Sequence, residues 1–413
     1  MMGATLATPT AMGDADAVSG LAGALDGLRV LDFSQIGAGP TCSMYLADLG
    51  ADVVKVEPPG GDVGRALAPP WYGSEAAIFV AFNRGKRSLC LDLKAEEGRC
   101  AARRLALRAD VVVESFRPGV MARLGLGYGA LAAERPGLVY CSVSGFGQTG
   151  PFAAHAGVDG IVQAASGLMS LIGGPDDAPS KVQAPIVDVT TGFIATIAVL
   201  GAILRRQRTD LGAHLDVSLF GSALALQQSA LTQYFAEGRP PERIGSAAPY
   251  SAPNEAFRTE DGWIMVAAYL GDRWSRLCAI LGRPELAEDA RFATSPARLA
   301  HRAEMQRELN AAFVRRSTAA WVLELERADI LCSPVASFDD LAVHPQARHM
   351  GAFGTVGGAD GQTYHLPASP FGIRGPVPHL PRLGEHSRAV LAEAGFAEQA
   401  ISDLMRAGIA REP

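Results

Sequence analysis

Apolar residues alternate with short polar and glycine-containing turns along the first half of the chain, a pattern typical of strands and helices that follow one another. The pattern predicts strands at 28–34, 51–57, 87–93, 110–115 and 137–146, with helices at 41–50 and 96–109. Gly50 closes the first helix, and the first three elements form a βαβ unit. The first half is therefore predicted to be α/β with a mostly parallel sheet.

Two long apolar helices, at about 190–206 and 218–235, then interrupt the alternation. Residues 236–254 are dense in Pro and Gly, which indicates a linker or a domain boundary. Beyond it, residues 256–268 predict a β-hairpin that turns at Asp261 and Gly262, followed by helices. After Pro345 the chain is again rich in Gly and Pro, and it predicts one helix, at 387–396, in a tail that returns to the first domain.

These patterns divide the chain into a flexible extension, a large α/β domain and a small α+β domain. Residues 1–25 are rich in Ala and Gly and hold no Lys or Arg, so they lack the basic segment of a signal peptide. The large domain is predicted to comprise residues 26–225 and 350–413. The linker and the small domain are predicted to comprise residues 226–349.

Composition narrows the class of function. The formal net charge of −6 argues against a nucleic-acid partner, because recognition of a phosphate backbone normally needs a basic face. The six cysteines have no metal-ligand spacing and are interpreted as buried thiols in a reducing cytoplasm, without zinc or disulfides. The longest apolar run, near 193–204, is shorter than the ~20 residues that span a bilayer, so no membrane segment is predicted.

The turn Gly37-Ala38-Gly39-Pro40 stands between a predicted strand and a predicted helix. Its missing side chains would let backbone N–H groups approach a phosphate at the helix N-terminus. The turn partly matches a dinucleotide-binding fingerprint, with Glu57 at the acidic position, but Cys42 stands where the third glycine belongs. A plain turn with Pro40 at the first helical position is the alternative, and both interpretations stay open.

Five cations gather in two short stretches of this acidic chain. Arg84, Lys86 and Arg87 lie within 83–88, and Arg117 and Arg123 lie in the second stretch. Together they can neutralise the phosphates of a bulky anionic ligand. The alternative is an ordinary solvated face.

Asp188 stands at the start of the first long apolar helix, after a glycine-rich segment at 144–160. An Asp before Thr-Thr-Gly is typical of a helix N-cap, which needs no chemistry. A carboxylate can also be a nucleophile that forms a covalent acyl intermediate. The sequence has no GxSxG, HExxH or P-loop pattern, so hydrolase triads and metal chemistry gain little support.

Taken in order, these stretches resemble the family III CoA-transferases, the group that includes formyl-CoA and carnitine CoA-transferases. The resemblance runs from about residue 28 to 396. It is carried by VLDFSQIGAGP, LADLGADVVKVEPPGGD, NRGKRSLCLDLK, VVESFRPGVMARLGLGY, YCSVSGFGQTGP, PIVDVTTG and LGEHS. Each motif alone is weak, but their joint occurrence at this spacing is specific.

The resemblance implies that Asp188 is the nucleophile and forms an aspartyl-CoA thioester, with coenzyme A as the carried group and no metal. It also implies contacts with coenzyme A at Gly37, Ala38, Asn83, Lys86, Arg87, Ser115, Phe116, Arg117 and Arg123. Gly245 and Ser246 are the corresponding candidates for contact with the substrate acid.

Three positions depart from the family pattern. Pro58 stands where some members stack an Arg on adenine, and Ser115 stands where Asn is usual. The related α-methylacyl-CoA racemases share the aspartate and add a histidine in an AGHD motif. Here the motif is AGVDG, and Val158 cannot shuttle a proton, which favours a transferase over a racemase.

The resemblance further implies a Rossmann-like large domain that binds coenzyme A, a smaller domain and an interlocked homodimer. We expect a cytoplasmic enzyme whose partners are an acyl-CoA and a carboxylic acid. Three alternatives remain: an acyl-CoA racemase or epimerase with another base, a non-catalytic protein that binds CoA esters, and a dinucleotide oxidoreductase. The sequence leaves the acids open, since a small dicarboxylic acid and a hydrophobic or aromatic acid fit equally well.

Overall fold

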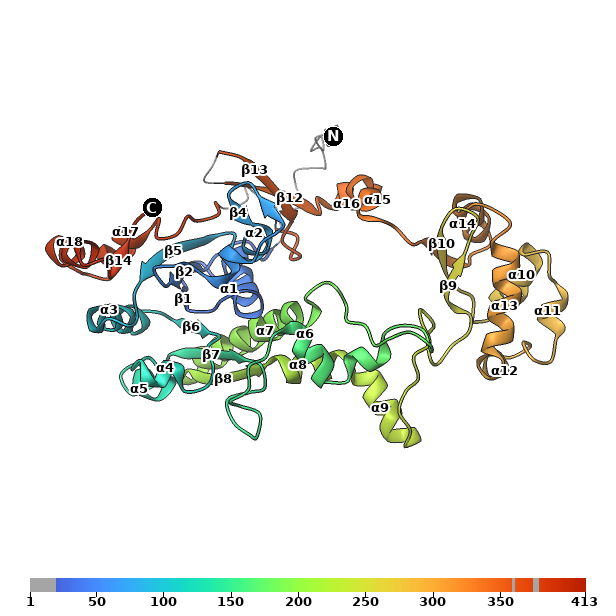
Figure 1. Cartoon of the computed structure of the whole chain (residues 1–413), viewed down its shortest axis with the longest axis horizontal. Helices are drawn as coiled ribbons and strands as arrows, with labels where there is room; N and C mark the ends of the chain where they lie inside the picture. The colour runs from blue at the N-terminus through green and yellow to red at the C-terminus, as the bar shows by residue number, and fades with distance from the viewer. Residues whose placement is uncertain (1–19, 359–360, 374–378) are drawn as a thin grey trace. The chain divides into compact units, whose positions relative to one another are not determined.

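The computed structural model describes residues 20–358, 361–373 and 379–413 (Figure 1). The chain forms two compact units: unit 1 comprises Met1–Leu168, Lys181–Glu237 and Pro345–Pro413, and unit 2 comprises Met169–Ser180 and Gly238–His344. Most of the predicted flexible extension, residues 1–19, lies outside the described residues. The remainder forms turns, in which Leu25 donates its backbone N–H to Leu49 O at 2.9 Å.

A seven-stranded sheet in the order β14-β5-β2-β1-β6-β7-β8 forms the centre of unit 1. Its strands are β1 (Arg29–Asp32), β2 (Asp52–Glu57), β5 (Lys86–Leu91), β6 (Val111–Glu114), β7 (Val139–Ser144), β8 (Ala213–Ser218) and β14 (Ala410–Arg411). Six strands are parallel, and only β14 is antiparallel to its neighbour. The predicted, mostly parallel α/β sheet is confirmed. β14 also brings the tail back to this unit.

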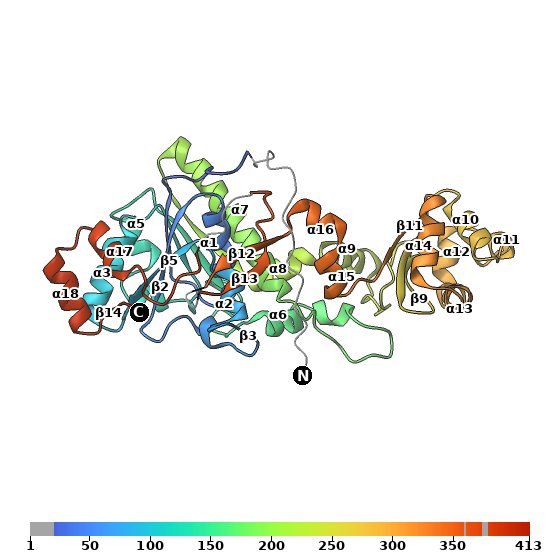
Figure 2. The same ribbon diagram turned by 90° about the horizontal axis from the view of Figure 1, so that it is seen from above.

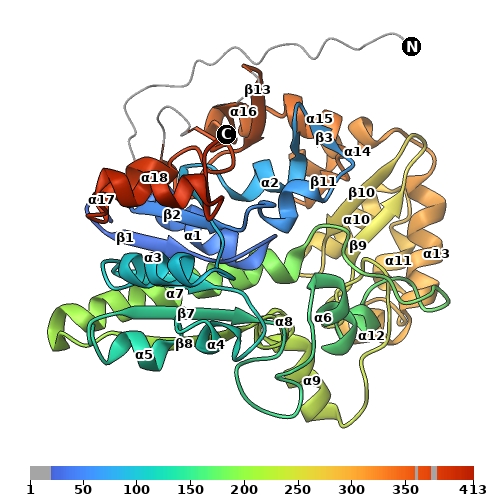
Figure 3. The ribbon, with the colours of Figure 1, turned by 60° about the vertical axis from the view of Figure 1, so that its left-hand side comes forward.

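Helices cover both faces of the sheet, because strands such as the Val-rich β6 are apolar on both sides. One layer comprises α1 (Ala38–Asp48), α6 (Asp159–Ala165), α7 (Ile186–Thr209) and α8 (Leu219–Leu226). The other comprises α3 (Glu96–Ala106), α4 (Val120–Arg123), α5 (Tyr128–Ala132), α17 (Ser387–Glu393) and α18 (Glu398–Arg406). In the first layer α7 runs beside β7 and β8 (Figure 3).

A separate small apolar cluster in unit 1 has Phe79, Val356 and Tyr364 at its centre. Its elements are the pairs β3 (Trp71–Tyr72) with β4 (Glu75–Ala76) and β12 (Phe353–Gly357) with β13 (Thr363–Pro367), α2 (Ala77–Phe82) and a 3₁₀ helix (Val63–Ala66). Two further helices of this unit are α9 (Gln228–Glu237) and α16 (Pro345–Met350).

Unit 2 is an antiparallel sheet with a helical cover and its own apolar core (Figure 2). The sheet has the order β11-β10-β9, with β9 (Asn254–Arg258), β10 (Trp263–Ala267) and β11 (Leu331–Pro334). The helices are α10 (Arg273–Ile280), α11 (Glu285–Glu288), α12 (Ser295–Ala300), α13 (Arg302–Phe313), α14 (Thr318–Arg327) and α15 (Phe338–Val343). The predicted hairpin at Asp261 and Gly262 is confirmed by the β9–β10 pairing. A 3₁₀ helix, Leu168–Leu171, begins at the last residue of the first segment of unit 1.

Several predicted helices differ from those observed. The helix expected at 190–206 is α7, which begins four residues earlier, so Asp188 lies within its first turn. The helix expected at 218–235 is broken at Gln227 into α8 and α9. The tail holds two helices, α17 and α18, instead of one, because Gly395 takes a positive φ of 81° and ends the first of them.

Two expectations from composition concern the helix α7 and the cysteines. By length and composition α7 could cross a membrane, although 44% of its most apolar stretch is buried in the protein, and a core helix has the same properties. The expected absence of a membrane segment therefore stays a prediction. The cysteines are not all buried, since Cys100 is exposed on α3 and Cys332 is half-buried.

Candidate functional site

Asp188 lies in the first turn of α7, close to the loop that precedes α1. Asp159, the first residue of α6, accepts hydrogen bonds from the backbone N–H groups of Val187 at 2.8 Å and Asp188 at 3.2 Å. Gln163 fixes Asp159 by donating Nε2–H to its other carboxylate oxygen at 2.5 Å. Asp159, and not Asp188, therefore caps α7.

This arrangement answers one of the alternatives left open by the sequence. The N-cap position of α7 is Pro185, and Asp188 makes no capping hydrogen bond. Within the described residues, no hydrogen bond to the Asp188 carboxylate is found. Sequence reasoning missed Asp159, although it stands beside Val158 in the AGVDG motif and at the start of a helix.

Glycine is required at position 37 by the closeness of Asp188. A Cβ atom built on Gly37 would lie 2.5 Å from Asp188 Oδ2, so any other residue would displace the carboxylate. Gly192 similarly lets α7 approach α1, since its Cβ would lie 2.5 Å from Thr41. Asp188 therefore faces the beginning of α1, where the first backbone N–H groups have no partner within the helix.

A cavity of about 200 Å³ opens beside Asp188. It lies beyond the carboxyl ends of β1 and β6, where the strand order changes direction and α/β sheets commonly bind ligands. Its lining comprises Gln35, Ile36, Gly37, Ala38, Gly39, Ser115, Phe116, Val143, Ser144, Gly145, Gly157, Val158, Asp188 and Leu219. The structure thus brings four of the predicted contacts, Gly37, Ala38, Ser115 and Phe116, together with Asp188.

The environment of Asp188 disfavours its charged form. Burial, together with the smaller effect of the neighbouring negative charge of Asp159, raises the pKa of the Asp188 carboxyl to about 7. A carboxyl group with this pKa changes its charge near neutral pH. Strongly perturbed carboxyl groups at a cavity are typical of functional sites.

Lys86 and Asn83 lie beneath the beginning of α1. The buried Lys86 ammonium donates to Asp32 Oδ2 at 3.1 Å, Pro40 O at 3.0 Å and Asn83 Oδ1 at 2.9 Å. Burial lowers the pKa of Lys86 to about 8, although Asp32 opposes the shift. These two predicted contacts do not line the cavity; they support the helix that does.

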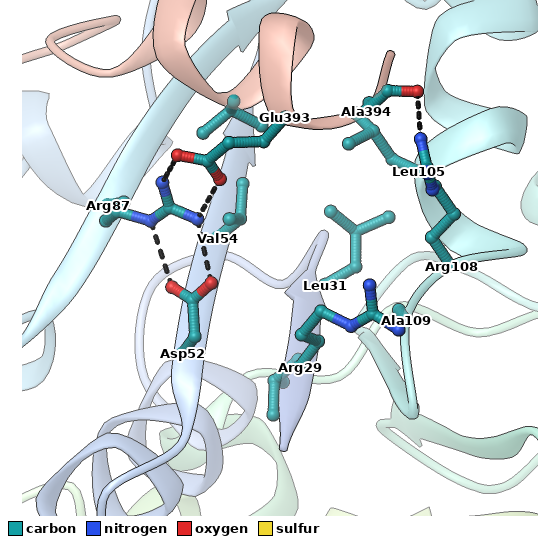
Figure 4. Close-up of a pocket in the computed structure, with 12 residues that line it drawn as sticks. Arg29, Leu31, Asp52, Val54, Arg87, Leu105, Arg108, Ala109, Glu393 and Ala394 are labelled. Atoms are coloured by element: carbon teal, nitrogen blue, oxygen red, sulfur yellow. Dashed lines mark hydrogen bonds and ion pairs between the residues drawn. The ribbon is translucent and has the colours of Figure 1, made fainter. Parts of the chain in front are cut away.

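Arg87 lies elsewhere. Successive residues of a strand point to opposite faces, so Arg87 points away from Lys86, toward α3 and α17. Its guanidinium bridges Asp52, at 2.9 and 2.8 Å, and Glu393, at 2.9 Å to each oxygen (Figure 4). These three residues line a small cavity near the amino ends of the strands, together with Arg29 and Arg108. The structure does not bring Arg87 to Asp188.

Arg117 and Arg123 follow Phe116 along the chain and are exposed. Neither has an ion-pair partner in the part of the chain that the structure describes. Arg117 lines a second cavity, of about 340 Å³, next to Glu114 and His214. Burial raises the pKa of Glu114 to about 7. Two unpaired cations thus stand next to the loop that lines the Asp188 cavity.

Gly245 and Ser246 belong to unit 2. Gly245 donates its N–H to Gly173 O at 3.0 Å, and Ser246 Oγ accepts from Ala256 N at 2.9 Å. Both therefore help to fix the start of the small domain. Across the described ranges, no group of three His, Cys, Asp or Glu side chains is placed to hold a metal ion.

Comparison with known proteins gives a consistent result. The family model of CoA-transferase family III matches residues 25–387. A succinate–glutarate CoA-transferase of Agrobacterium fabrum is 38% identical over 91% of this chain and 96% of its own. An acetyl-CoA:oxalate CoA-transferase of Acetobacter aceti is 37% identical over 91% and 97%. The crystal structure of a CAIB/BAIF family protein from Brucella suis matches with a TM-score of 0.80 and 37% identity, covering 90% of this chain and 99% of that one.

Proposed function

The chain belongs to CoA-transferase family III, and from this premise we propose that it moves coenzyme A between two carboxylic acids through a covalent intermediate on Asp188. The observation that carries the proposal is the Asp188 carboxyl group itself. It is mostly buried at a cavity, has no hydrogen-bond partner among the described residues, and has a pKa of about 7. A carboxylate without partners keeps its lone pairs for a substrate.

The transfer proceeds in two symmetrical halves. An Asp188 oxygen attacks the acyl carbon of the donor thioester, the C–S bond breaks, and coenzyme A leaves as a thiolate with the bonding electrons. The thiolate then attacks Asp188 Cγ of the mixed anhydride, which releases the donor acid as a carboxylate and leaves an aspartyl-CoA thioester.

The acceptor carboxylate attacks the same Cγ and expels the thiolate again. The thiolate attacks the acceptor acyl carbon, which forms the new thioester and frees Asp188. No net proton or electron is exchanged, so the cycle needs no redox cofactor.

The beginning of α1 supplies electrostatic support for this chemistry. Each attack places negative charge on a carbonyl oxygen, and preorganised backbone N–H groups stabilise such charge. Gly37, Ala38 and Gly39 line the cavity, and the N–H groups of Ala38 and Gly39 have no partner within α1. Lys86 supports the start of this helix from below by donating to Pro40 O, and Asn83 Oδ1 accepts from the same ammonium group.

The unpaired guanidinium groups of Arg117 and Arg123 are suited to the phosphates of coenzyme A. Phe116 and Ser115, which line the cavity, would lie along the rest of the carried group. Val158 lines the same cavity and offers no proton-exchanging group, so the pocket favours transfer over racemisation.

The acids are proposed to be small dicarboxylic acids. The names of two relatives specify succinate with glutarate and acetyl-CoA with oxalate. A cavity of about 200 Å³ beside Asp188 has room for an acid of this size.

We further propose a cytoplasmic homodimer. On α7, the large apolar side chains of Ile197 and Leu204 are 68% and 61% exposed, as expected for a surface that a second subunit covers. Analytical ultracentrifugation tests this directly: a dimer is expected, and a monomer at micromolar concentration would reject it.

The central test is mass spectrometry of the protein incubated with succinyl-CoA, glutaryl-CoA, oxalyl-CoA or acetyl-CoA and quenched with hydroxylamine. We expect a hydroxamate on the peptide that contains Asp188, and none in Asp188→Asn. The matched control is Asp403→Asn on the exposed face of α18, which should retain the adduct. Binding of coenzyme A without an adduct would point to a racemase or a non-catalytic binder, and binding of NAD to an oxidoreductase.

A further inference from the structure

Ile36, next to Gly37, has an unusual backbone conformation. Its φ is +69°, in the left-handed region, and a β-branched residue is a strong outlier there. The other two non-glycine residues with positive φ among the described ranges are Asp210 and Asp329, a residue type that tolerates this region. A conformation of this kind persists only where the surrounding structure imposes it.

The carboxylate of Asp62 holds Ile36 in place. Asp62 Oδ1 accepts the backbone N–H of Ile36 at 3.1 Å and that of Gly64 at 2.7 Å. Asp62 is only 2% exposed, so its oxygen has no competing water shell. One oxygen therefore joins the loop after β1 to the segment after β2.

Lys55 in turn holds Asp62. Its Nζ forms an ion pair with Asp62 Oδ2 at 2.6 Å and donates to Ser34 O at 2.8 Å, and both side chains are essentially inaccessible. Burial alone would lower the pKa of Lys55, but the carboxylates of Asp32, Asp62 and Glu57 raise it above the ordinary value. The ammonium thus remains charged. It binds the 34–36 loop directly at Ser34 O and, through Asp62, at the N–H of Ile36.

Gly37, the next residue of this loop, faces the Asp188 carboxylate. Gly37 lies so close to it that an added Cβ would come within 2.5 Å of Asp188 Oδ2. A rotation of the 36–37 peptide would therefore move the groups facing Asp188. A contiguous path therefore runs from Lys55 through Asp62 to Ile36, and through the next peptide bond to Gly37, which faces Asp188.

We propose that Lys55 and Asp62 are positioning residues of the transfer reaction, which hold Ile36 in its strained conformation and so place Gly37 and the start of α1 against Asp188. The inference rests on the proposed role of Asp188 as the nucleophile. Neither residue touches the substrate. Their action is on orientation, and a misplacement of about 1 Å can cost about 100-fold in rate.

A simple loss of stability is a competing explanation. Replacing a buried ion pair by apolar residues of similar volume is often neutral for stability, whereas removal of one partner strands a buried charge. Both charges must therefore be removed together, and the hydrogen-bond acceptor must be varied separately.

The test compares two double variants, both of which lack the charges of Lys55 and Asp62. Lys55→Met/Asp62→Asn keeps a side-chain oxygen for the N–H groups of Ile36 and Gly64, and Lys55→Met/Asp62→Leu has the same shape without one. We expect kcat of the Leu variant to be about tenfold or more below that of the Asn variant. The KM values of the two variants for the acyl-CoA should agree within about twofold. The single-turnover rate of adduct formation on Asp188 should fall in parallel.

A third substitution separates strain from stability. Glycine adopts a φ of +69° without a steric penalty, so Ile36→Gly added to the Leu variant should raise kcat at least about threefold above that of the Leu variant alone.

Asp110→Ala is the matched control. Like Asp62, Asp110 accepts a backbone N–H, that of Arg29 at 3.0 Å, and forms an ion pair, with Arg135. It lies near the amino ends of the strands, away from Asp188. Its kcat should be unchanged where the protein is folded.

Equal kcat values in the Asn and Leu variants, or a loss that Ile36→Gly does not restore, would overturn the inference while the adduct on Asp188 stands. Absence of the adduct in the unmodified protein would instead remove the proposed function on which it rests. Circular dichroism and thermal unfolding of every variant show whether each one is folded.

Discussion

The Asp52 and Asp110 carboxylates near one end of the sheet in unit 1 contrast with the Asp188 carboxyl group at the other end. Near the amino ends of the strands, Arg87 bridges Asp52 and Glu393, and Asp110 pairs with Arg135 at 2.8 Å. Beyond the carboxyl ends, Asp188 has no ion-pair partner among the described residues, and its pKa rises to about 7. The comparison teaches that the paired charges stabilise the fold, whereas the unpaired carboxyl group retains the capacity to react.

The largest expected effect comes from neutralising one carboxylate at each end. Asp188→Asn should lower kcat by about 10³-fold or more, because an amide is a poor nucleophile and the covalent route is lost. Asp52→Asn should change kcat by less than about twofold, since it loosens only a partly exposed ion pair. Steady-state kinetics of both variants check this, and similar losses in the two would break the comparison.

The second effect concerns the cations. Arg117→Ala and Arg123→Ala should each raise KM for the acyl-CoA by about tenfold, because a charged hydrogen bond to phosphate is worth about 1.5–3 kcal/mol. Arg87→Ala should leave KM within about twofold, since its guanidinium is occupied by Asp52 and Glu393. A KM that rises in Arg87→Ala as much as in the other two would restore Arg87 as a contact with coenzyme A.

The third effect is on the pH profile. The nucleophile must be ionised, so kcat/KM should rise with pH and level off above a pKa of about 7, with about tenfold lower activity one pH unit below it. Asp159→Asn removes the nearby negative charge and keeps an acceptor for the N–H groups of α7, so the rise should move to lower pH. An unmoved profile would assign the titration to another group, such as Glu114, whose pKa is also about 7.

The smallest effect is on stability. The pKa of Asp188 is raised in the folded state from 3.8 to about 7, so the unfolded chain releases its proton first, and stability falls as pH rises through this window. Asp188→Asn should therefore be more stable than the unmodified protein at about pH 8 by on the order of 1–2 kcal/mol, with little gain at about pH 4. Denaturant unfolding at the two pH values measures it, and an equal gain at both would contradict the linkage.

The sequence predicts the elements around Asp188 well because each leaves a local signal. The apolar runs of β1, β6 and β7 and the glycines after β1 are visible in the sequence itself, whereas only the family resemblance linked Gly37 with Asp188. Lys86 and Arg87 are adjacent in the sequence, but a strand sends neighbouring side chains to opposite faces, so the structure separates two residues that the sequence grouped together. The cap supplied by Asp159 and the contact of Asp62 with Ile36 join residues 29 and 26 positions apart, and such pairings depend on tertiary packing.

The order in which a ribosome makes this chain is relevant to one feature of the fold. Residues 238–344, which form most of unit 2, are synthesised after β8 but before β14, the strand that flanks β5. Until β14 is made, β5 is an open edge strand, and open edges invite pairing with other chains. The nascent protein thus passes through a stage in which the small unit can already be folded while one side of the large sheet still requires protection from aggregation.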